Sequence, residues 1–118
     1  MREFERGQMT SKVRYHMFPC DNRSNIEVRM TDEWDFEVEA TSTCPKVERF
    51  LNGLSPLSMT DLTDKAESKV FREFVVSDMS ANCLAPSAVL TAAWVEAGMI
   101  ARSNTRKGIP LSIEFVND

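Results

Sequence analysis

The chain has 118 residues, of which 42% are hydrophobic and 27% are charged, and its formal net charge at pH 7 is −4. These values are typical of one soluble globular domain with a core of its own. The acidic balance argues against a broad phosphate-binding surface, so we expect no nucleic-acid partner. No apolar run reaches the roughly 18 residues that span a bilayer, and the first residues lack the apolar core of a signal peptide. We therefore expect a cytoplasmic protein with no membrane partner.

The first third of the sequence predicts an antiparallel sheet. Residues 1–11 show no sustained period and are expected to form a loose N-terminal extension, so that residues 12–118 make up a single domain. Apolar and polar residues then alternate, as they do in half-buried strands, over residues 12–18, 25–31 and 36–41. Turn-forming residues separate these segments, which favours a meander with one apolar face. A layer of helices should cover that face.

Helical spacing of apolar residues follows. Pro45 marks the start of a first helix that ends near Gly53. Ser58 and Asp61 resemble a capping box, and we predict a second helix from there to about Ser77. Residues 68–77 are rich in β-branched and aromatic residues, so a strand is the alternative there.

The longest and most apolar helix candidate begins near Pro86, which we place at its first position, and continues to about Arg102. After a polar turn, Pro110–Val116 alternates again and is predicted to be the last strand. The sequence therefore predicts a two-layer α+β fold in the order β-β-β-α-α-α-β. An antiparallel sheet of about four strands is covered on one face by about three helices.

The three cysteines stand at the ends of predicted elements. Cys20 follows the first strand, Cys44 opens the first helix, and Cys83 precedes the last helix. If these ends share one edge of the sheet, the three sulfurs surround a common point, with His16 as a further ligand. Such a set suits zinc or an iron–sulfur cluster, although there is no CxxC pair. Burial as small apolar residues is the alternative.

A reactive thiol is a second chemical hypothesis. Cys44 and Cys83 both lie where the amides of a helix N-terminus stabilise a thiolate. Cys83 is the stronger candidate for a catalytic nucleophile. The sequence alone does not show whether the protein is an enzyme.

Two resemblances accompany these residues. Cys83-Leu84-Ala85-Pro86 resembles the cysteine–x–x–proline entry to a helix in sulfur-carrier proteins that pass persulfide during thiolation of transfer RNA, with Leu84 in place of their second proline. The order of Cys20, then Cys44-Pro45, then Cys83 with Pro86 more broadly resembles an uncharacterised family of small prokaryotic three-cysteine α+β proteins, chiefly from methanogens and other anaerobes. That similarity runs over most of residues 12–116 and implies that the cysteines form one site.

The leading hypothesis is a small binding or carrier module in which Cys20, Cys44 and Cys83 hold a soft metal, an iron–sulfur cluster or a sulfur species. The alternative is an interaction or oligomerisation protein with structural cysteines and no bound cofactor. Its contact face would come from Trp34, Trp94 or the last helix. A homodimer is expected because so small a sheet leaves an edge strand to protect.

Overall fold

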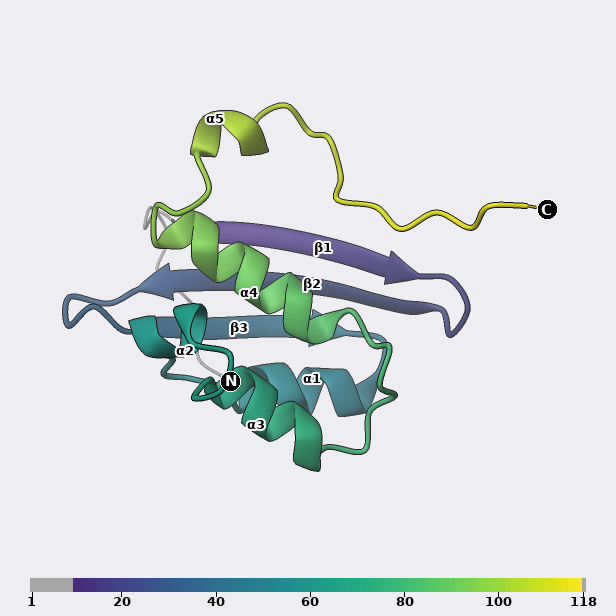
Figure 1. The fold of residues 1–118 in the computed structure, drawn as a ribbon, viewed down its shortest axis with the longest axis horizontal. Helices are drawn as coiled ribbons and strands as arrows, with labels where there is room; N and C mark the ends of the chain where they lie inside the picture. The colour runs from purple at the N-terminus through teal and green to yellow at the C-terminus, as the bar shows by residue number, and fades with distance from the viewer. Residues whose placement is uncertain (1–9, 118) are drawn as a thin grey trace.

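The computed structural model describes residues 10–117 and shows an α+β fold with a three-stranded antiparallel sheet and five helices (Figure 1). The predicted N-terminal extension, residues 1–11, lies almost entirely outside the described residues. The elements are β1 (Ser11–Met17), β2 (Asn22–Met30), β3 (Phe36–Ser42), α1 (Pro45–Asn52), α2 (Met59–Thr63), α3 (Lys69–Val76), α4 (Ala85–Glu96) and α5 (Arg102–Thr105).

The three predicted strands are confirmed as a meander in the order β1-β2-β3. In register, Val13 lies opposite Ile26, which lies opposite Ala40. This row belongs to the apolar face, which α4 covers over β1 and β2 and α1 covers over β3 (Figure 1). The alternation seen in the sequence thus decides which side of the sheet meets the helices.

The predicted second helix is two helices, which corrects the sequence analysis. The capping box is present, since the Ser58 backbone N–H donates to Asp61 Oδ2 at 2.8 Å and the Asp61 N–H donates to Ser58 Oγ at 3.3 Å. The second carboxylate oxygen of Asp61 accepts the Lys69 N–H at 2.8 Å, and Ser68 caps a new helix. Asp61 therefore anchors the starts of both α2 and α3, and residues 68–77 are largely helical rather than a strand.

Helix α4 is the central helix of the fold. It begins at Ala85, so Pro86 is its second residue rather than its first, and it ends at Glu96, earlier than predicted. The Glu96 carboxylate lies among three partners: it accepts from Ser11 Oγ at 2.8 Å, from the Met30 N–H at 2.9 Å and from Arg102 at 3.0 Å. This buried side chain ties the end of α4 to β1, β2 and α5. None of the described helices is long and apolar enough to cross a membrane.

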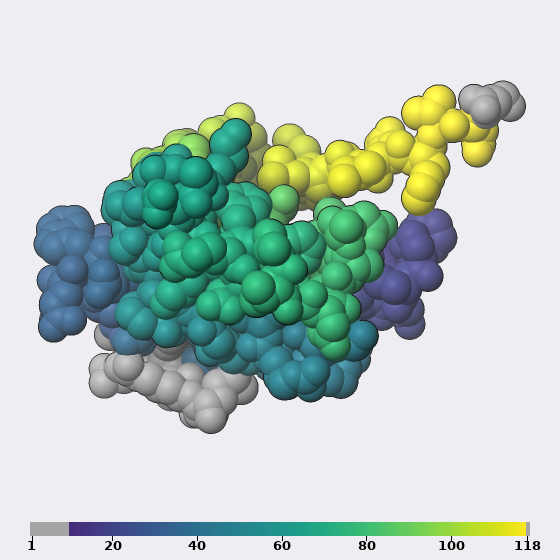
Figure 2. All heavy atoms as spheres, turned by 60° about the horizontal axis from the view of Figure 1, so that its bottom comes forward, coloured from purple at the N-terminus to yellow at the C-terminus, as the bar shows by residue number. Residues whose placement is uncertain are grey.

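The predicted last strand is wrong. Residues 109–117, here called the C-terminal arm, have no partner strand and leave the body of the protein as an extended segment (Figure 2). The arm leaves the polar turn after α5 at Gly108, whose φ of +67° is a conformation that glycine adopts easily. The sheet consequently has three strands rather than about four.

The outer edge of β3 is closed by side chains and by one backbone bridge. Phe36 exchanges backbone hydrogen bonds with Leu57, and Ser55 Oγ bonds to both the N–H and the C=O of Val38. The Asn52 amide does the same for Ala40, with both distances 2.9 Å. The Ser42 N–H donates to Glu48 Oε1 at 3.0 Å. The segment from α1 to α2 therefore prevents any further strand from pairing with β3.

Asn52→Ala should lower the free energy of unfolding by about 1–3 kcal/mol, because it leaves both backbone groups of buried Ala40 without partners. Urea denaturation followed by circular dichroism measures the change. Asn82→Ala, at an exposed position in the loop before α4, is the control and should stay within about 0.5 kcal/mol of the parent. Equal effects of the two substitutions would contradict the assigned role of Asn52.

Candidate functional site

The three cysteines come from loops at one end of the sheet. Cys20 lies in the turn between β1 and β2, Cys44 is the residue before α1, and Cys83 lies in the loop that enters α4 (Figure 1). All three are free thiols; Cys20 is exposed, whereas Cys44 and Cys83 are half-buried. The topology therefore places the three loops at one end of the sheet, which was the condition for a shared site in the sequence analysis.

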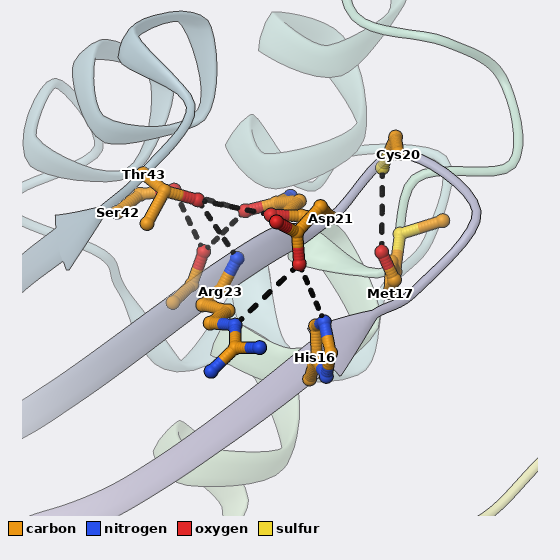
Figure 3. A network of polar contacts seen from close by, with 9 residues as sticks. His16, Met17, Cys20, Asp21, Arg23, Ser42 and Thr43 are labelled. Atoms are coloured by element: carbon orange, nitrogen blue, oxygen red, sulfur yellow. Dashed lines mark hydrogen bonds and ion pairs between the residues drawn. The ribbon is translucent and has the colours of Figure 1, made fainter.

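Around Cys20 the polar contacts are those of a tight turn (Figure 3). Its thiol lies 3.7 Å from the carbonyl oxygen of Met17. Asp21, with a φ of +52°, lies 2.9 Å from His16 Nε2 and 3.5 Å from Arg23 Nε. The hydrogen bond with His16, followed by the charge of Arg23, lowers the pKa of Asp21. His16 is thus engaged by a carboxylate of its own turn and not by a sulfur.

A buried polar network runs beneath the other two cysteines. Asn22 donates to the Tyr15 hydroxyl at 3.1 Å, and Ser24 Oγ lies 3.0 Å from Asn22 Oδ1. Ser24 Oγ is also 2.8 Å from Ser42 Oγ, which accepts the backbone N–H of Cys44 at 3.0 Å. Asn22 and Ser24 are both buried. These buried polar groups are satisfied by one another, as interior polar groups must be.

Tyr15 connects this network to Cys83. Burial raises the pKa of Tyr15 to about 12, and the adjoining Cys83 thiol acts in the same direction through its charge and a hydrogen bond. Hydrogen bonds with Ser24 and Asn22 oppose the increase. The arrangement keeps a neutral phenol beside a half-buried thiol.

The described residues contain no group of three or more histidine, cysteine, aspartate or glutamate side chains able to hold a metal ion. Lying at one edge of the sheet thus does not by itself make Cys20, Cys44 and Cys83 a ligand set. The reason is that Cys44 and Cys83 pack against the core, whereas Cys20 lies exposed in its turn. A zinc or cluster site on these three residues has no support in this geometry, and the nucleophilic role predicted for Cys83 stays a prediction.

No described helix covers the second face of the sheet, which is polar. It bears a depression of about 380 Å³ lined in part by Lys12, Arg14, Glu27 and Glu39. Its two basic groups lie on β1 and its acidic groups on β2 and β3: Lys12 is opposite Glu27, which is opposite Glu39. Charges of both signs side by side indicate a solvated face.

The C-terminal arm carries the largest set of exposed apolar side chains among the described residues. Ile109, Leu111, Ile113 and Phe115 occur at every second position and are between 74% and 84% exposed. None of them belongs to the core. Phe115 packs edge-on against Phe18 in the β1–β2 turn, with ring centroids 5.8 Å apart. The arm thus has the pattern of a half-buried strand but lacks the surface that would bury it.

The two tryptophans named in the interaction hypothesis differ in their surroundings. Trp34 is 71% exposed in the β2–β3 turn, at a φ of +67°. The Trp94 indole N–H donates to the Leu62 carbonyl oxygen at 2.9 Å, so this residue joins α4 to α2.

The arm is the surface that sequence reasoning missed, because its alternation was assigned to a fourth strand of the chain's own sheet.

Comparison with known proteins adds one family. Residues 11–108 match a family of unknown function, DUF6951. The chain belongs to this family. No curated protein and no solved structure matches the chain. The expected membership in an uncharacterised family is confirmed, while its prokaryotic origin and the sulfur-carrier resemblance stay predictions.

The DUF6951 match divides the chain into two parts. The sheet, the five helices and all three cysteines lie within the matched residues, whereas the arm follows them. The packed core likewise ends before the arm. Neither the family match nor the core cluster includes the arm.

Tyr15 is the chain's single tyrosine, so absorbance at 295 nm titrates it alone. In the folded protein the midpoint should lie near pH 12, and in 8 M urea near the ordinary value of about 10. Because the folded pKa is raised, Tyr15 contributes stability that is complete below pH 10 and is lost as the pH rises through 12. Circular dichroism recorded in parallel monitors the fold.

Cys83→Ala should lower the Tyr15 midpoint in the folded protein, because it removes a neighbour whose charge and hydrogen bond both raise the Tyr15 pKa. Cys44→Ala is the matched control and should leave the midpoint unchanged. Equal shifts in both variants would show that Cys83 is not the neighbour of Tyr15.

Proposed function

We propose that this protein is an oligomerisation module that associates with further copies of itself through the C-terminal arm. The observation that carries the proposal is the arm's row of four apolar side chains, which are all exposed and stand at every second position of an extended segment. Burying such a side chain is worth about 1.5–3 kcal/mol. An extended segment with an exposed apolar side promotes aggregation unless another surface covers that side.

The domain without the arm is complete. Its core cluster draws on β2, β3 and the helices up to α4, and the DUF6951 match ends at residue 108. The arm therefore adds contact surface and is not needed to close the core. This separation favours a role in association over a role in folding.

Removal of residues 109–118 should abolish association and leave the domain folded. We expect the full chain to show a concentration-dependent mass above 13.4 kDa in light scattering, and the truncated chain to remain a monomer. The free energy of unfolding of the truncated chain, compared at dilute concentration, should change by no more than about 0.5 kcal/mol.

Ile113→Asp and Ser112→Asp provide a matched pair in the full chain. Both add one negative charge to the arm, the first among its apolar side chains and the second on its polar side. Only Ile113→Asp should weaken association. A full chain that is monomeric at every concentration tested would overturn the proposal.

A thiol carrier centred on Cys83 is the second candidate, and the placement of Cys83 beside the neutral Tyr15 at the start of α4 favours it. Accessibility alone predicts that exposed Cys20 is alkylated first. Faster alkylation of half-buried Cys83, located by peptide mapping, would support an activated thiol. Slow alkylation of Cys83 would contradict it.

A further inference from the structure

We infer that the arm of each chain pairs, as an antiparallel strand, with the outer edge of β1 in a second copy, and receives that copy's arm in return. The inference rests on the self-association proposed above and names its receiving surface. Such an exchange is reciprocal and closed, so it yields a dimer rather than a filament. In each subunit the sheet would grow from three strands to four.

The sheet has two edges, and only one of them is available within the described residues. The backbone groups that β3 turns outward belong to alternate residues from Phe36 to Ser42, and each of these residues has a partner in the α1–α2 segment. Alternation of the ladders through β2 then turns the backbone groups of Lys12, Arg14 and His16 outward from β1. No residue among 10–117 pairs with them. A strand that joins this sheet must therefore join at β1.

The arm and β1 match in length and in chemistry. The strand β1 has seven residues, and Leu111, Ile113 and Phe115 repeat the spacing of Val13, Tyr15 and Met17. Val13 and Tyr15 are only half-buried beneath α4, as expected of residues that lack a neighbour on one side.

Charge fixes the register. On the polar face of the sheet, β1 carries Lys12, Arg14 and His16, whereas the polar side of the arm carries Ser112 and Glu114. With Glu114 opposite Arg14, the three apolar residues of the arm fall opposite Met17, Tyr15 and Val13 on the helix-covered face. Opposite charges in directly facing positions stabilise an antiparallel pair.

A second copy fits better than the chain's own β1. In its own chain the arm runs in the same direction as β1 and stands away from it, touching Phe18 through Phe115 (Figures 1 and 2). Pairing there would be parallel, whereas every existing pair in this sheet is antiparallel. A twofold-related copy presents β1 in the opposite direction, and it allows Glu114 to face Arg14.

Charge reversal in the full chain tests the pairing, with sedimentation equilibrium as the measurement. Arg14→Glu and Glu114→Arg should each raise the dimer dissociation constant about tenfold, since each places like charges opposite one another at both contacts. Mixing the two variants in equal amounts should restore parent affinity, because both contacts of the mixed dimer then join opposite charges. Glu39→Arg, on β3, is the control and should have no effect.

Each other outcome overturns the inference in a distinct way. A chain that carries both Arg14→Glu and Glu114→Arg provides a further comparison. If this double variant dimerises as the parent does but the mixture of single variants does not, residues 14 and 114 face one another within one chain, and the arm pairs with its own β1. If the full chain forms an arm-dependent dimer that neither charge reversal weakens, the arm binds another surface, and the proposed oligomerisation stands without this pairing. If the full chain is a monomer, both fail together, and arm amides that exchange rapidly with deuterium would show an unpaired arm.

Discussion

The structure depends on the unequal treatment of the two edges of a small sheet. Three strands expose two rows of backbone donors and acceptors, and each row is a template for a further strand. The protein closes the β3 row with the chain that immediately follows that strand: Asn52 and Ser55 bond as a neighbouring strand would, and Leu57 adds a backbone bridge. The same segment packs α1 onto the apolar face. One segment of the chain therefore both closes the β3 edge and covers part of the apolar face.

Among the described residues, nothing closes the β1 edge, and no surface covers the apolar side chains of the arm. The β1 edge and the arm match in length and in apolar pattern, and their charges are opposite in sign. The buried Glu96 carboxylate holds β1, β2 and Arg102 together at the point where the chain turns toward the arm. The start of α5 is thus fixed relative to the open edge, while the apolar residues of the arm extend beyond the body. This geometry favours exchange between copies.

The cysteines show how a shared location differs from a shared site. All three lie at one end of the sheet, yet the nearest polar organisation involves Tyr15, Asn22, Ser24 and Ser42 rather than sulfur. That network satisfies buried polar atoms between the ends of the three strands. Cys83 meets it through Tyr15, and Cys44 meets it through its backbone N–H. The two half-buried cysteines thus contact this polar network and also pack against the apolar core.

The sequence by itself determined the meander, the helix that begins at Pro45, the Ser58–Asp61 capping box and the apolar character of α4, because these depend on local periodicity and on capping chemistry. It also predicted a strand over Pro110–Val116, which the structure does not form. Only the tertiary structure decided that this segment pairs with no strand among the described residues, since a two-residue period does not tell whether a sheet edge is available to it. The same holds for the cysteines: their positions along the chain are local, but the distance between their sulfurs depends on how α1 and α4 pack across the sheet. Asp61 divided the predicted long helix for a similar reason, because its bond to the Lys69 N–H joins residues that no helical period connects.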